Sequence, residues 1–181
     1  MYYASIILAI STFIACGKED PEPPGGEELI TTLNYTLVPQ GGGTTVTLTF
    51  SDLDGDGGDA PIITGGTLVA NTSYSGSIEL LNESVSPAED ITEEIAEEDA
   101  EHQFFFESSA ADMSVSYNDM DDDGNPVGLS NTLTTGDATS ATLKVTLRHE
   151  PAKSADNVAS GDITNAGGET DIEVTFDVEV Q

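Results

Sequence analysis

Apolar and polar residues alternate along much of the chain after residue 29. The clearest stretch is Ile172–Val180, where every second residue is apolar and the residues between are Glu, Thr or Asp. The same alternation occurs in segments 33–37, 46–50, 74–80, 113–117 and 143–147. Strands with one polar face are typical of antiparallel sheets, and several short strands in one domain favour a sandwich. We therefore expect an all-β fold, an antiparallel immunoglobulin-like β-sandwich, with turns at Gly41–Gly43 and Gly167–Gly168.

One segment has a helical pattern instead. Ser86–Glu89 reads Ser-Pro-Ala-Glu, which places a capping hydroxyl before proline and a glutamate three residues later, as in a capping box. Ile91 and Ile95 follow on one helical face, and glutamates occupy the other faces. We expect one short acidic helix that starts at this box and ends before Glu101.

The amino terminus has the pattern of an export leader. Residues 6–14 are almost wholly apolar, and the small residue Ala15 precedes Cys16. A cysteine in this position resembles a bacterial lipobox, in which the thiol is acylated and becomes the new amino terminus. The apolar run is too short for a membrane-spanning helix, which needs about 20 residues. We expect a lipoprotein signal peptide over 1–15, lipidated Cys16 with a Pro- and Gly-rich flexible tether over 16–28, and a domain over 29–181.

Charge narrows the classes of partner. The chain carries 34 acidic and 4 basic residues, a formal net charge of −30. Such a surface repels nucleic acid and anionic lipid headgroups and attracts cations, so a membrane contact must come from the lipid anchor. The sequence has no Gly-x-Ser-x-Gly motif and no phosphate-binding glycine loop between a strand and a helix. We therefore expect a non-catalytic protein, monomeric as a domain.

Two acidic loops repeat one pattern. Each follows an alternating strand and reads Asp-x-Asp-x-Asp-Gly. Carboxylates at alternate positions before a glycine turn resemble the first half of a calcium loop, although neither loop has the distal Glu of an EF-hand. The predicted calcium ligands are Asp52, Asp54, Asp56 and Asp59 in the first loop and Asp119, Asp121 and Asp123 in the second. The alternative is ordinary Asp-Gly turn chemistry without a metal.

The two histidines suggest another metal site. His102 is in phase with the apolar residues of 104–106, and His149 is in phase with those of 143–147, so both are expected to face the core near strand ends. Each has a neighbouring glutamate, as Glu150 follows His149. If the strands are neighbours, His102, His149 and Glu150 could bind zinc or copper; the alternative is a pair of hydrogen-bonded core histidines.

Several segments resemble a family of small acidic lipoproteins of Bacteroidota. They are residues 52–58, 77–83, 87–95, 102–106, 147–151 and 161–174. Members are often labelled type 1 periplasmic binding fold proteins, but that fold is two-lobed with alternating β and α units, which this sequence lacks. The family implies no established activity. The run Lys18-Glu19-Asp20 resembles the signal that sends such lipoproteins to the outer face of the outer membrane.

Together these features predict a lipid-anchored outer-membrane protein that faces the cell surface, with the periplasmic face as the alternative. We expect a binding module for a metal or small ligand, accessory to a TonB-dependent outer-membrane transporter. The alternative is a calcium-stabilised structural or adhesive β-sandwich.

Overall fold

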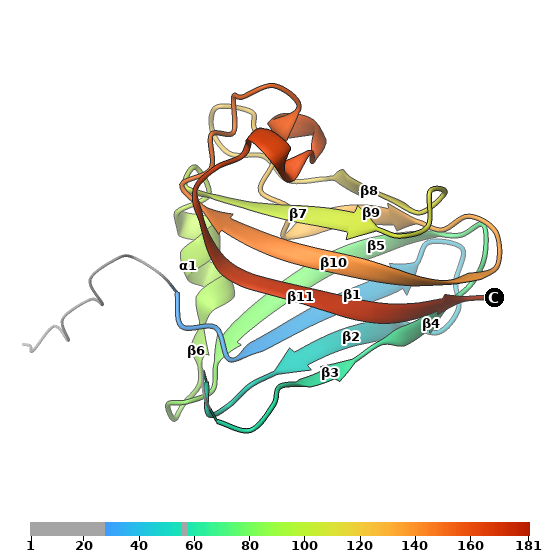
Figure 1. The fold of residues 1–181 in the computed structure, drawn as a ribbon, viewed down its shortest axis with the longest axis horizontal. Coiled ribbons are helices and arrows are strands. Elements are labelled where there is room, and N and C mark those ends of the chain that lie inside the picture. Colours follow the sequence, from blue (N-terminus) through green and yellow to red (C-terminus); the bar gives the residue numbers. More distant parts are fainter. Residues whose placement is uncertain (1–27, 56–57) are drawn as a thin grey trace, which may run out of the picture.

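The computed structural model describes residues 28–55 and 58–181 of the chain. The predicted leader, Cys16 with the tether up to residue 27, and Asp56 lie outside the described residues. The described chain forms two stacked β-sheets with one short helix at one end (Figure 1). The predicted all-β sandwich is thereby confirmed, while its immunoglobulin-like character stays a prediction.

The larger sheet has the strand order β3-β2-β1-β5-β9-β8, with β6 paired to β5, and the smaller sheet has the order β4-β11-β10-β7. The strands are β1 Thr32–Pro39, β2 Val46–Ser51, β3 Ile62–Thr64, β4 Gly66–Leu68, β5 Ser73–Asn82, β6 Glu89–Asp90, β7 His102–Ser108, β8 Ser114–Tyr117, β9 Ser130–Thr134, β10 Thr139–His149 and β11 Glu169–Val180. The helix α1 is Ile91–Glu97, and 3-10 turns occur at Val158–Ser160 and Ile163–Asn165. Within these sheets only β4 and β11 run parallel.

The predicted hairpin at Gly41–Gly43 is confirmed, because β1 and β2 pair antiparallel on either side of it. Segment 62–68 then changes from the larger to the smaller sheet at Gly65. A Cβ at residue 65 would lie 1.9 Å from the backbone oxygen of Asp177, so only glycine lets the chain pass β11 at this distance. The segment β3–Gly65–β4 therefore connects the two sheets at this edge of the sandwich.

The core lies between the two sheets. Leu33, Tyr35 and Leu37 of β1 are fully buried, as is Phe176 of β11. The Tyr35 hydroxyl donates a hydrogen bond of 2.6 Å to the side-chain oxygen of Asn131, which is also fully buried. The aromatic ring therefore contributes apolar area to the core while its polar end has a partner.

The helix starts later than the sequence pattern predicts. Ser86 does not cap it, because β6 pairs with β5 and occupies the residues expected in the first turn. Asp90 is the capping residue, and its side chain accepts a 3.0 Å hydrogen bond from the backbone N–H of Thr92. Ile91 and Ile95 are buried on the core side, as their spacing predicts. The helix ends before Glu101, as expected.

The predicted hairpin turn at Gly167–Gly168 is wrong. β10 and β11 do pair antiparallel, but residues 150–168 form a long connection with both 3-10 turns. This connection covers Phe105 on the outer side of the smaller sheet, where Val158 and Ala166 are packed against the ring. A tight turn would leave that ring in water, which explains why the longer path is favoured.

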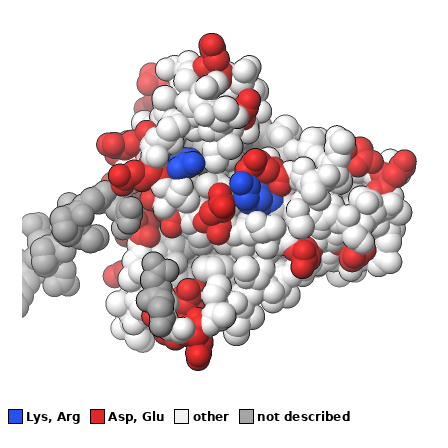
Figure 2. All heavy atoms as spheres, in the orientation of Figure 1, with Lys and Arg blue, Asp and Glu red and all other residues white. Residues whose placement is uncertain are grey.

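Acidic side chains are spread over the face in Figure 2, and the basic groups on that face lie among them. Lys144 on β10 has two acidic neighbours: its Nζ lies 2.6 Å from a carboxylate oxygen of Glu107 and 3.5 Å from one of Glu173. No helix of the described residues is long and apolar enough to cross a membrane.

Candidate metal centre

The two histidines meet at one end of the smaller sheet. β7 and β10 pair antiparallel, and the register places His102 directly opposite His149. Both side chains point to the core side, and their rings stack with centroids 4.7 Å apart and an interplanar angle of 25°. The neighbouring strands that a two-histidine site requires are therefore present.

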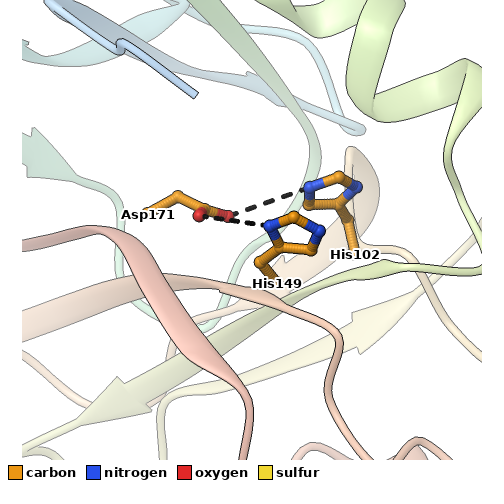
Figure 3. A group of neighbouring side chains, drawn as sticks. All are labelled: His102, His149 and Asp171. Carbon is orange, nitrogen blue, oxygen red and sulfur yellow. Dashed lines mark ion pairs between the residues drawn. The ribbon is translucent and has the colours of Figure 1, made fainter. Parts of the chain in front are cut away.

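Asp171 completes the group (Figure 3). One of its carboxylate oxygens lies 3.9 Å from His102 Nε2, and the other lies 4.0 Å from His149 Nδ1. The side chains of His102 and Asp171 are fully buried, whereas 13% of the His149 side chain is exposed. Potential ligand atoms of the three residues all lie within 4.8 Å of one another.

A β-bulge puts Asp171 in this position. Leu147 on β10 pairs with Ile172, but the next residue, Arg148, pairs with Thr170, so Asp171 is an extra residue on β11. A bulge breaks the strict alternation of strand side chains and re-aims the residue at the extra position. Asp171 therefore leaves the solvent face that alternation with Glu173 assigns to it and is buried beside the histidines.

Gly168 lets β11 begin close to the histidines. Its φ is +69°, and a Cβ there would lie 2.2 Å from the backbone oxygen of His149. A side chain at this position would push the start of β11 away from the end of β10. The glycine thus brings Asp171 within reach of the strand pair that carries the histidines.

The second ring nitrogen of each histidine faces an oxygen atom. His102 Nδ1 lies 3.1 Å from the backbone oxygen of Glu98; because a carbonyl only accepts, Nδ1 carries the proton and donates. His149 Nε2 lies 3.8 Å from a carboxylate oxygen of Glu101. Metal-binding histidines have this arrangement, in which an outer oxygen orients the ring and sets its tautomer.

Burial favours the neutral form of His102. Desolvation lowers the pKa of His102 below its ordinary value, and nearby His149 lowers it further, while the hydrogen bond to Glu98 opposes the shift. The neutral tautomer with a proton on Nδ1 has its lone pair on Nε2. That nitrogen is buried and has no hydrogen-bond partner among the described residues. A buried nitrogen acceptor without a donor is costly, and a cation would satisfy it.

Carboxylates crowd around the histidines. Glu28, Glu98 and His102 form a second group of potential ligands within 4.8 Å, and Glu101, His149 and Glu150 form a third. Burial raises the pKa of Glu28 to about 7, and the hydrogen bond and charge of Glu94 add to the shift. The raised pKa of Glu28 thus comes first from burial and then from neighbouring carboxylates, and a cation bound nearby would lower it.

The spacing suits a small ion after a slight contraction. Zinc binds histidine nitrogen at about 2.0–2.1 Å, so ligand atoms of a tetrahedral site lie about 3.3 Å apart. The two separations to Asp171, 3.9 and 4.0 Å, exceed this value by well under 1 Å. Two imidazoles and a carboxylate are a donor set for zinc and related ions that leaves a further coordination position open.

The first aspartate loop uses its carboxylates in local turns. Asp52 accepts a hydrogen bond of 3.0 Å from the backbone N–H of Gly55, and Asp54 accepts one of 2.8 Å from that of Asp59. These bonds are the Asp-Gly turn chemistry that forms the alternative to a metal. Asp52, Asp54 and Asp59 belong to no potential metal group among the described residues, and Asp56 lies outside them.

The second loop is held in a similar way. Asp119 accepts hydrogen bonds of 2.8 Å from the backbone N–H groups of Gly128 and Ser130. Asp121 accepts bonds from the N–H groups of Asp123 and Asn125, and its other oxygen lies 3.1 Å from Lys153 Nζ.

The Lys153 side chain is 5% exposed and the Asp121 side chain 2% exposed, so this ion pair is buried. Asp119, Asp121 and Asp123 are all described, and the structure does not bring them together as a metal group. Calcium binding by the two loops stays a prediction.

The structure thus brings together His102 and His149 with Asp171, while Glu150 lies in the more exposed group beside His149. Asp171, Glu98, Glu101 and Glu28 were not identified from the sequence. The pairs Glu101-His102 and His149-Glu150 are sequence neighbours and gave a signal for Glu101. No local pattern marks Asp171, because its burial depends on a bulge between two strands.

Comparison with known proteins adds no identification: no family model matches the chain, and no curated protein or solved structure is significantly similar to it.

Proposed function

We propose that this protein is a lipid-anchored, non-catalytic binding module whose ligand is a divalent transition-metal ion of the zinc and copper class. The ion is held by His102 Nε2, His149 Nδ1 and the Asp171 carboxylate. One observation carries the proposal: the buried Nε2 of His102 has no hydrogen-bond partner within residues 28–55 and 58–181 and faces two further potential ligands.

The donor set supports the class of metal. Imidazole nitrogen suits zinc and copper, whereas calcium takes six to eight oxygen ligands and magnesium retains water in an octahedral shell. Three protein ligands leave a coordination position for a ligand from outside the chain. Such a site can accept an ion from a chelate and release it to another protein, which is the behaviour expected of an uptake accessory.

The predicted leader and Cys16 support attachment to the outer membrane. The net charge of −30 makes the lipid, rather than the protein surface, the source of membrane affinity. The tether, the domain size and the acidity support a role beside a TonB-dependent transporter at the cell surface. Deletion of the gene should abolish growth when metal is limiting. The wild-type gene should restore this growth and the Cys16→Ser variant should not, which would test both the uptake role and the anchor.

Metal binding is tested directly on the full-length chain purified in detergent and stripped with a chelator. We expect one zinc ion per chain by indicator competition. His102→Gln and His149→Gln should each weaken zinc binding by about 100-fold or more, beyond the 10–100-fold cost of losing an outer-shell partner. Asp123→Asn, an exposed change in the second aspartate loop, is the matched control and should leave zinc affinity unchanged.

Failure of the wild type to bind zinc or copper in a saturable way would refute the proposal. Equal weakening by Asp123→Asn and His102→Gln would place the ion in the loop instead.

A further inference from the structure

We propose that Glu101, Glu150 and the outward-facing Nε2 of His149 form an outer binding position, through which a divalent metal ion reaches the buried centre. This inference rests on the proposed function and adds a route of access to it. The three residues form a group whose potential ligand atoms lie within 4.8 Å of one another.

Burial identifies the accessible side of the centre. The side chains of His102 and Asp171 are fully buried, 13% of the His149 side chain is exposed, and 57% of the Glu101 side chain is exposed. Among the three inner ligands, His149 is therefore the one that reaches water. An ion that arrives from solvent meets Glu101 and His149 before it meets Asp171 or His102.

His149 belongs to both positions. Its Nδ1 lies 4.0 Å from Asp171, on the inner side, and its Nε2 lies 3.8 Å from Glu101, on the outer side. A single ring carbon separates the two nitrogens of an imidazole, so an ion can move from one to the other along the edge of the ring. While the ion is at Nε2, the ring proton is on Nδ1. As the ion moves to Nδ1, that proton is released to water and Nε2 takes up a proton from water, so the total charge is unchanged. Nε2–H is then placed to donate to Glu101, which holds the ring.

A backbone hydrogen bond joins the two residues that carry the outer carboxylates. The N–H of Glu150 donates a hydrogen bond of 2.6 Å to the backbone oxygen of Glu101, across the end of the β7–β10 pair. Glu150 also has a left-handed φ of 48°, which turns the chain at the end of β10.

The ligand types give a direction to the transfer. The outer position has two carboxylates and one imidazole and is largely solvated, so it holds a hydrated cation weakly. The inner position has two imidazoles and a buried carboxylate, which bind zinc-class ions more strongly. An ion captured outside would therefore move inward.

Kinetics on the full-length chain in detergent can test this route. The probe is Co²⁺, whose visible absorption reports nitrogen coordination. The test variant is Glu101→Gln with Glu150→Gln. The matched control is Glu93→Gln with Glu97→Gln, which removes two exposed carboxylates of α1 that belong to none of the potential ligand groups among the described residues. Thermal melts establish that both variants fold.

An access role changes both rates, because a route used for binding is also used for release. We expect the association and dissociation rates of the Glu101/Glu150 variant to fall together by about ten-fold or more, which is the lower end of the 10–10³ range over which local fields change association. Glutamine keeps a side-chain oxygen that can still accept from His149 Nε2–H, so the outer support of the ring remains. The equilibrium Kd should therefore stay within about three-fold of the wild-type value, and the control should keep its association rate.

Three results would overturn the inference while leaving the proposed function intact: an unchanged association rate, a slower association without slower dissociation, or an equal loss in the control variant. The second result would mean that the carboxylates only attract cations at a distance. If the wild type shows no saturable Co²⁺ absorption, the proposed function itself fails.

Discussion

At the scale of single residues, the state of His102 determines what the centre can bind. The ring is buried, its Nδ1–H is committed to the Glu98 carbonyl, and its pKa is lowered mainly by desolvation. These three facts keep Nε2 unprotonated and directed at Asp171 and His149. A metal ion and a proton compete for that one lone pair, so the centre should lose its ion in acid.

The same shift affects the stability of the metal-free protein. A histidine whose pKa is lower when folded binds fewer protons in the native than in the unfolded state. Its stabilising contribution is therefore complete above the unfolded pKa near 6.5 and is lost between that pH and the lower folded pKa. We expect the free energy of unfolding of the wild type, measured with urea in a chelator, to fall relative to His102→Gln as the pH drops from about 7.5 to about 5.5. Parallel pH profiles for the two proteins would contradict this assignment.

At the scale of elements, the site depends on strand ends rather than on a loop motif. The β7–β10 register sets the histidine pair, and the bulge on β11 adds Asp171. The helix contributes the Glu98 carbonyl, since Glu98 is its C-terminal cap and follows its last residue.

The observed cap leads to a prediction about the helix. Asp90→Ala removes the side-chain acceptor for the Thr92 N–H and should lower the free energy of unfolding by about 1 kcal/mol. Ser86→Ala, at the position that the sequence pattern favours as the cap, should change it by less than about 0.5 kcal/mol. Parallel urea titrations of the two variants show which residue caps the helix. A larger loss in Ser86→Ala than in Asp90→Ala would mean that the helix starts at the capping box.

At the scale of the whole molecule, one buried ion pair joins distant parts of the chain. Asp121 lies in the loop after β8, which belongs to the larger sheet, and Lys153 lies in the connection between β10 and β11 of the smaller sheet. Burial alone would raise the pKa of Asp121, but the N–H of Asn125 and the Lys153 ammonium outweigh it, so the pKa lies below its usual value. The pair therefore favours the folded state at neutral pH.

Breaking this pair should be costly. Lys153→Met keeps a similar volume but leaves the Asp121 charge buried without its cation, and should lower the free energy of unfolding by about 3–5 kcal/mol. The double variant Asp121→Asn with Lys153→Met should recover part of that loss, because the uncompensated charge is gone. Urea unfolding at neutral pH measures both effects, and a loss below about 1 kcal/mol in Lys153→Met would show that solvent reaches the pair.

Local patterns in the sequence were sufficient for much of the fold. Strict alternation in 172–180 and 33–37 predicted strands with one buried face, because every second side chain of a strand lies on the same side. The histidines were placed on the core side by the same reasoning. The local pattern predicts the wrong helix start and a turn at Gly167–Gly168 that the structure lacks, because β6 pairing and the covering of Phe105 depend on residues far along the chain.

The sequence by itself determined the fold class, the inward direction of both histidines and the large acidic charge. Only the tertiary structure decided that His102 and His149 are directly opposed, that a bulge buries Asp171 beside them, and that Asp121 has Lys153 as its partner. The physical reason is how far apart in the sequence the interacting residues lie. Alternation and charge are properties of neighbouring residues, whereas register, bulges and buried ion pairs arise only when strands distant in sequence are packed together.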